Sequence, residues 1–216
     1  MVPVGELNSF NQKTFDNIAN ALSQTGYMVL KNTINKNLLQ SLQLRIKQIP
    51  TQLWQQAGVG RKQGHQINTD IRSDKISWIT QEDPIEKEFL DYMEYIRHGI
   101  NQRLFLGLFD YESHFSIYSK GSYYQKHVDS LKGNSNRVLS TVVYLNDNWQ
   151  ENHGGELLIY NDTQIIQSVL PHFGTMVIFL SEGIPHEVLK ANRERHSIAG
   201  WFRANANHSN IVDPSQ

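Results

Sequence analysis

Residues 138–149 read VLSTVVYLNDNW, an apolar run that ends in an Asn-Asp-Asn stretch. An apolar run of this length in front of turn-forming residues is typical of a β-strand. Short strands of the same kind are expected throughout the second half of the chain, at 114–118, 123–128, 138–145, 156–160, 164–168, 175–180, 186–189 and 197–202. About eight short strands at close spacing predict a sandwich, a jelly roll or a small barrel.

The first 110 residues predict mainly helices. Apolar residues recur at helical spacing over 15–22, 38–49 and 85–104, with a short strand at 27–30 after the first of these stretches. Each stretch follows a residue suited to cap a helix, namely Ser9, Asn35 and Asp83. We expect these helices to buttress one side of the β core.

The segment from Gly58 to Lys75 differs from its surroundings, because it carries glycines and charges with little apolar material. Long loops in compact domains are commonly functional. The expected fold is therefore α+β with a mainly β core, built as a single domain over residues 1–216. Residues 1–110 would form the helical support, residues 111–203 the core and residues 204–216 a polar tail.

The composition excludes several classes of protein. Lys and Arg number 20 against 21 Asp and Glu, so the basic excess typical of nucleic-acid binding is missing. No Cys occurs in the 216 residues, which excludes disulfides, thiolate metal sites and cysteine nucleophiles. No signal peptide and no apolar run of about 18 residues is found. We expect a cytoplasmic protein that binds neither membrane nor nucleic acid.

Three elements of the β half suggest a metal site with an anion site beside it. His127 and Asp129 stand two residues apart on a predicted strand, so their side chains would point to the same face. His186 follows several strands later, and two histidines with one carboxylate form the facial triad of non-haem Fe(II) oxygenases. Arg195 lies on the last strand, where an inward guanidinium needs an anion and fits a carboxylate with two hydrogen bonds.

The order His-x-Asp, His, Arg resembles the signature of the Fe(II)/2-oxoglutarate-dependent dioxygenases. Residues 70–78, DIRSDKISW, resemble the substrate loop of the hypoxia-inducible-factor prolyl hydroxylases and their bacterial relatives. Tyr124, residues 143–149, Gly154-Gly155 and residues 186–188 agree with the same family. The resemblance covers roughly residues 70–202, with weaker agreement in the N-terminal helices.

The resemblance implies a double-stranded β-helix, or jelly roll, with a dioxygenase core over residues 111–203. It makes His127, Asp129 and His186 the Fe(II) ligands. It assigns the far carboxylate of 2-oxoglutarate to Arg195, with Tyr144 and, after a one-residue gap, Tyr118 lining the pocket. The substrate loop would span about 58–78, and the residues that contact or shape the peptide site would be Arg72, Asp74, Trp78, Tyr124, Arg137 and Trp201.

The implied reaction is hydroxylation of a prolyl residue in a protein, with O2 consumed and succinate and CO2 released. The resemblance also implies ascorbate as a further reductant and, for a bacterial protein, elongation factor Tu as substrate. Two departures stand out. Ala199 replaces a hydroxyl-bearing residue of the animal enzymes, and Arg195 stands where collagen-type enzymes have Lys.

Three alternatives remain open at the level of the sequence. The same chemistry could act on a free amino acid or another small molecule, although the 70–78 stretch argues for a larger substrate. The fold could instead serve as a non-catalytic, cupin-like binding module. The same ligands could hold zinc in a hydrolase, although Arg195 would then have no role. The sequence carries no indication of the oligomeric state.

Overall fold

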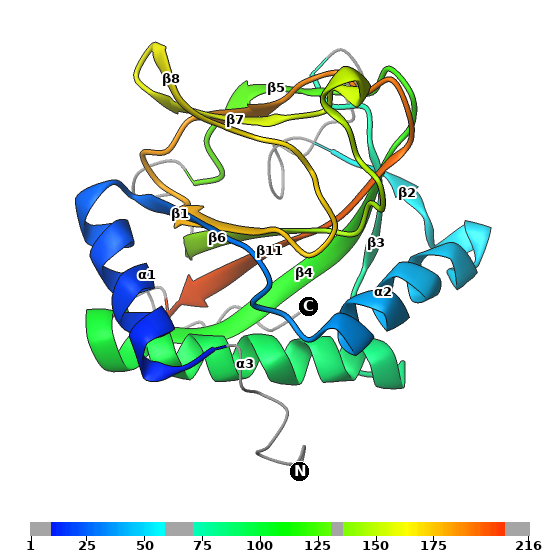
Figure 1. Cartoon of the computed structure of the whole chain (residues 1–216). Coiled ribbons are helices and arrows are strands. Elements are labelled where there is room, and N and C mark those ends of the chain that lie inside the picture. Colours follow the sequence, from blue (N-terminus) through cyan, green and yellow to red (C-terminus); the bar gives the residue numbers. More distant parts are fainter. Residues whose placement is uncertain (1–9, 59–70, 131–135, 206–216) are drawn as a thin grey trace.

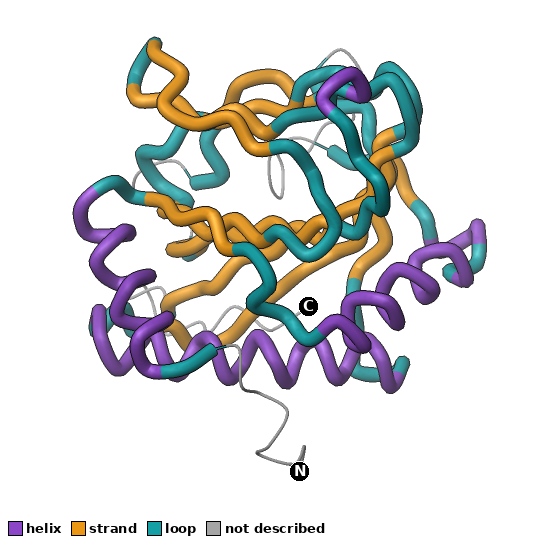
Figure 2. The backbone as a smooth tube through the Cα atoms, in the orientation of Figure 1, coloured by secondary structure: helices purple, strands orange, loops and turns teal. Residues whose placement is uncertain are grey.

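The computed structural model describes residues 10–58, 71–130 and 136–205, which form two antiparallel sheets and a layer of helices. Figures 1 and 2 show the two sheets facing each other, with the helices on the outer side of the larger sheet. Ser9, most of the 58–75 segment and the tail after residue 205 lie outside the described residues. The jelly-roll prediction is confirmed by this arrangement.

The larger sheet has seven strands in the order β1 (Tyr27–Leu30), β9 (Met176–Leu180), β6 (Arg137–Tyr144), β11 (Arg195–Ala204), β4 (Leu108–Tyr118), β3 (Lys75–Trp78) and β2 (Gln55–Gln56). The smaller sheet has the order β5 (Tyr124–His127), β10 (His186–Val188), β7 (Leu157–Asn161) and β8 (Gln164–Val169). Neighbouring strands are antiparallel in both sheets.

Three α-helices cover the larger sheet: α1 (Gln12–Gln24), α2 (Lys36–Gln48) and α3 (Pro84–Leu104). Asn35 and Asp83 cap α2 and α3 as predicted, because their side chains accept hydrogen bonds from the first backbone N–H groups. The cap of α1 is Asn11, whose side chain accepts from the Thr14 N–H, so this helix begins later than the Ser9 signal suggested. None of the described helices is both long and apolar enough to span a bilayer.

The strands differ from the expected pattern at the edge of the larger sheet. Residues 75–78, which were expected to belong to the substrate loop, form β3 and pair with β4. The short strand β2 was also not predicted, since two glutamines carry no periodic signal. The apolar side chains of the helices and of one sheet face form the main core, and a second, smaller cluster lies between the two sheets.

Gly99 lets α1 and α3 approach closely, and this contact yields a stability prediction. A Cβ atom at Gly99 would lie 2.4 Å from two carbons of the Phe15 ring. Alanine should gain about 1 kcal/mol of helix propensity, but overpacking a filled core costs about 1–3 kcal/mol. We expect Gly99→Ala to lower the melting temperature by a few degrees in thermal unfolding. A rise in melting temperature would show that Phe15 moves aside at no cost, and Phe15→Leu in the same chain should relieve the loss.

Candidate metal centre

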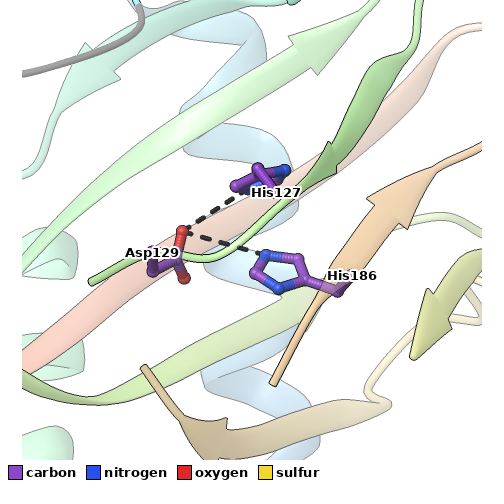
Figure 3. Close-up of side chains that lie close together, drawn as sticks. All are labelled: His127, Asp129 and His186. Atoms are coloured by element: carbon purple, nitrogen blue, oxygen red, sulfur yellow. Dashed lines mark ion pairs between the residues drawn. The ribbon is translucent and has the colours of Figure 1, made fainter. Parts of the chain in front are cut away.

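The pairing of β5 with β10 brings two distant histidines together. His127 is the last residue of β5 and His186 the first of β10, and the antiparallel register places them opposite each other. Asp129 lies two residues beyond His127, after the strand has ended. The three residues offer ligand atoms that all lie within 4.8 Å of one another (Figure 3). The three groups meet as expected, but β5 ends at His127, so the segment after the strand, and not strand alternation, places Asp129.

One oxygen of the aspartate faces both imidazoles. Asp129 Oδ1 lies 3.5 Å from His127 Nε2 and 3.8 Å from His186 Nε2. The Nδ1 atoms are directed to backbone carbonyls, at 2.7 Å from Gln125 O and 3.0 Å from Ile184 O. Because a carbonyl only accepts, each Nδ1 must carry the proton, which leaves the Nε2 lone pairs free for a cation.

The pKa values of this group favour metal binding. Burial, followed by the neighbouring His127, lowers the pKa of His186 to about 4. Burial would raise the pKa of Asp129, but His186, His127 and a hydrogen bond from Ser140 outweigh it and hold this pKa well below its ordinary value. At neutral pH the aspartate is therefore ionised and His186 is neutral. These are the protonation states in which carboxylate and imidazole coordinate a metal.

A buried arginine without an acidic partner lies in the same region. Arg195 begins β11 and is 1 % exposed, and its hydrogen bonds go to Gly155 O at 3.1 Å and Ser197 Oγ at 3.3 Å. No carboxylate of the described chain lies within ion-pair distance of it. A buried cation of this kind is costly unless an anion reaches it. The guanidinium therefore marks a place for an anionic ligand.

Two tyrosines flank this guanidinium. Its carbon lies 4.9 Å from the ring centre of Tyr118 and 5.0 Å from that of Tyr144. The Tyr144 hydroxyl is fully buried beside this guanidinium, and burial raises the pKa of Tyr144 although Arg195 opposes the shift. A carboxylate bound in this region would supply the negative charge that the guanidinium lacks.

One cavity of about 700 Å³ joins the metal group to the arginine. Its volume suits a small dicarboxylate together with part of a larger substrate. The residues predicted from the sequence that line it are Arg72, Tyr118, Tyr124, His127, Asp129, Arg137, His186, Arg195 and Trp201. Ala199 lines it too, so a methyl group faces the cavity at this position.

Asp74, Trp78 and Tyr144 are not among the lining residues of the cavity. Asp74 is fully buried and forms a two-point ion pair with Arg72, with distances of 2.6 and 2.9 Å. Arg72 in turn lies 4.8 Å from the ring centre of Tyr124. Asp74 therefore orients Arg72 and cannot touch a peptide directly. Of the two roles expected for Asp74, contacting the peptide and shaping its site, only the second fits this position.

Glu112 was missed at the level of the sequence, although it holds one wall of the cavity. Its Oε1 lies 2.7 Å from Arg137, whose guanidinium carbon lies 3.4 Å from the ring centre of Trp201. The second oxygen of Glu112 lies 3.5 Å from Arg203. Glu112 belongs to no motif in the sequence. It meets Arg137 only because β4 and β6 pair with β11 from opposite sides, and no local pattern predicts that contact.

His114 is buried in the middle of β4, which begins at Leu108 and not at the predicted residue 114. Its ring lies edge-on to Trp78 at 5.3 Å and tilted to Trp201 at 5.4 Å, and its Nδ1 lies 3.0 Å from Ser116 Oγ. Burial, followed by the charge of Arg72, lowers the pKa of His114 to about 3. The folded protein therefore keeps this imidazole neutral in mildly acidic solution.

This histidine should make folding stability depend on pH. Because its pKa is lowered in the folded state, the unfolded chain binds a proton below about pH 6.5 that the folded chain does not bind. The free energy of unfolding should therefore fall as the pH falls. Between about pH 7 and pH 5 the wild-type protein should lose unfolding free energy, and we expect His114→Gln to reduce this loss by up to about 2 kcal/mol. Urea unfolding of the metal-free protein at both pH values measures this, and an equal loss in both proteins would contradict it.

Comparisons with known proteins agree with this geometry. Residues 113–203 match the family model described as the 2OG-Fe(II) oxygenase superfamily. The chain is 33% identical to a Pseudomonas putida prolyl-4-hydroxylase of known structure, with a TM-score of 0.80 over 89% of this chain and 100% of that chain. A Trichoplax adhaerens prolyl hydroxylase, solved with a hypoxia inducible factor peptide, gives a TM-score of 0.78 at 22% identity, over 89% of this chain and 90% of that chain.

A curated human relative, Egl nine homolog 1, is 30% identical over 145 residues, which cover 62% of this chain and 33% of the human protein. The chain thus spans about a third of the length of that relative. The Pseudomonas enzyme, in contrast, is matched over its whole length. The chain therefore belongs to the 2OG-Fe(II) oxygenase superfamily and, within it, to the prolyl hydroxylases.

Proposed function

We propose that this protein is an Fe(II)- and 2-oxoglutarate-dependent dioxygenase that hydroxylates a prolyl residue of a protein substrate. The observation that carries the proposal is one cavity holding His127, Asp129 and His186 beside a buried Arg195 without an acidic partner. A zinc hydrolase would need the three metal ligands but not the arginine. A simple binding module would not need the metal ligands and the arginine together.

The residues that line the cavity fit both Fe(II) and 2-oxoglutarate. His127 Nε2, His186 Nε2 and Asp129 Oδ1 would hold Fe(II) on one face, and Arg195 would hold the far carboxylate of 2-oxoglutarate with help from Tyr144 and Tyr118. When bound, Fe(II) and 2-oxoglutarate supply the oxidative chemistry, in which O2 gives one oxygen atom to succinate and one to the prolyl C–H bond while CO2 leaves. The protein contributes orientation and the exclusion of water.

The peptide would enter on the side of the cavity lined by Arg72, Tyr124, Arg137 and Trp201. Arg72 is held by Asp74 and Arg137 by Glu112, so both guanidinium groups are already neutralised. Among the described residues that line the cavity, Arg195 is then the arginine available to the dicarboxylate, and this would separate the cosubstrate from the peptide. Trp78 would shape this wall through its contact with His114. The lid role expected of the segment 58–78 stays a prediction, because residues 59–70 lie outside the described residues and residues 75–78 belong to β3.

The substrate is proposed as a proline-containing segment of a cytoplasmic protein, with the chain acting as a single domain. By resemblance to bacterial relatives, elongation factor Tu is the first substrate to test, and ascorbate is expected to support turnover. The test is incubation with cell lysate, Fe(II) and 2-oxoglutarate, followed by mass spectrometric mapping of new hydroxyproline. Oxidation restricted to other residue types would overturn the prolyl specificity and leave the reaction class standing.

Anaerobic titration separates the proposed reaction class from the other classes. The purified protein should develop a visible absorption band only when both Fe(II) and 2-oxoglutarate are present. A protein that binds Fe(II) without any such band on addition of 2-oxoglutarate would be a binding module or a hydrolase, and the proposal would fail.

A further inference from the structure

The two carboxylate oxygens of Asp129 have different surroundings. Oδ1 faces the two imidazoles, at 3.5 and 3.8 Å from their Nε2 atoms. Oδ2 points the other way and accepts a hydrogen bond of 2.6 Å from Ser140 Oγ. A carboxylate can bind a metal through one oxygen or through both. Here the second oxygen is already engaged by the protein.

The hydroxyl that engages Oδ2 is itself part of a buried pair. Ser140 lies on β6 and is 1 % exposed, and Ser181 follows β9 and is fully buried. Their Oγ atoms are 2.9 Å apart. Since the carboxylate only accepts, Ser140 gives its single proton to Asp129, and Ser181 must therefore donate to Ser140. Such a chain of hydrogen bonds polarises its members and strengthens the last one.

The backbone around Ser181 also fixes the segment that carries the ligand. The Ser181 N–H donates to Val138 O at 2.9 Å, on the strand of Ser140. The Ser181 carbonyl accepts from the Ser130 N–H at 3.0 Å, in the residue that follows Asp129. Hydroxyl and backbone contacts thus connect β6, the end of β9 and the segment that carries Asp129.

We infer that Ser140 and Ser181 are positioning residues that keep Asp129 a one-oxygen ligand of the metal. If Oδ2 were released, the carboxylate could rotate and bind through both oxygens, and it would then take a coordination position that 2-oxoglutarate or O2 needs. The hydroxyl pair keeps that position open. This inference rests on the proposed function, since it concerns the metal assigned there.

The test compares metal and cosubstrate binding by serine variants of the metal-free protein. Co(II) serves as the probe, because its visible spectrum reports both affinity and coordination number. We expect Ser140→Ala to bind Co(II) about 10- to 100-fold more weakly, with a changed spectrum and weaker subsequent binding of 2-oxoglutarate. Ser181→Ala should shift the same measurements in the same direction by less, because the bond to Asp129 remains.

Two further variants separate positioning from packing. Ser140→Thr keeps the hydroxyl and should restore Co(II) affinity and spectrum towards those of the wild type. Ser113→Ala is the matched control, because Ser113 is buried on β4 but lies on the face opposite to that of Ser116 and Tyr118, which line the cavity. It should leave both measurements unchanged.

The inference is overturned if Ser140→Ala binds Co(II) and 2-oxoglutarate as the wild type does. It is equally overturned if Ser140→Thr loses affinity as far as Ser140→Ala, because packing would then explain the effect. If Ser140→Ala does not fold, the test uses Ser181→Ala, which should also bind Co(II) and 2-oxoglutarate more weakly than the wild type. A wild-type protein that binds no Co(II) would contradict the proposed function itself, so the two failures are distinguishable.

Discussion

Replacing Asp129 by Ala is expected to abolish succinate formation. The variant would retain the two imidazoles but lose the negatively charged ligand, so Fe(II) would be held by two protein ligands without a compensating charge. Turnover should fall to the level seen without enzyme. The measurement is succinate released from 2-oxoglutarate at saturating Fe(II), together with Co(II) titration of the metal-free variant.

The matched control for this experiment is Asp91→Ala. Asp91 lies on α3 and forms an exposed ion pair with Lys87, and such pairs contribute about 0–1 kcal/mol to stability. This variant should keep wild-type turnover and wild-type metal binding. If Asp129→Ala also turned over normally, the assignment of the metal ligands would be wrong.

Replacing Arg195 by Gln should raise the KM for 2-oxoglutarate strongly while leaving metal binding in place. A buried charge pair that loses one partner costs about 2–5 kcal/mol, which corresponds to roughly 30-fold to several-thousand-fold in affinity. Glutamine can still donate a hydrogen bond, but it carries no charge and no fork of parallel N–H groups. The 2-oxoglutarate dependence of succinate formation measures the effect.

A cosubstrate analogue identifies the group that Arg195 contacts. The 2-oxo acid 2-oxopentanoate lacks the far carboxylate, so the wild-type protein should bind it much more weakly than 2-oxoglutarate. In Arg195→Gln the two acids should bind with similar affinity. A preference for 2-oxoglutarate that survives the substitution would place the far carboxylate elsewhere. Arg193→Gln, in the turn before β11, serves as the control for the loss of a nearby positive charge.

Local sequence patterns predicted most of the elements, because the signals for them are short-range. The apolar runs gave the positions of β6, β9 and β11 to within a few residues, and capping residues placed the starts of α2 and α3. Errors arose where the signal was weak, as at β2, or where a neighbouring polar residue capped the helix instead, as at Asn11. The strand spacing left a sandwich, a jelly roll or a small barrel open, and the resemblance selected the jelly roll. The residue spacing suggested the candidate ligands, and the resemblance agreed with them.

The remaining features of the site depend on contacts between residues far apart in the chain. The spacing of His127 and Asp129 is visible in the sequence, but the register of β5 against β10 decides that His186 lies opposite His127. A pattern of residue types cannot show that Arg195 is buried without an acidic partner among the described residues. It also cannot show that Asp74 is buried beside Arg72.

Residue types along the chain thus specify which groups are available and which strands and helices carry them, since propensity, periodicity and capping act over a few neighbouring residues. Pairing and packing between distant segments decide which of these groups meet, as with Ser140 and Ser181 behind Asp129. The physical reason is that hydrogen-bond geometry, desolvation and charge compensation depend on three-dimensional distance and not on separation along the chain.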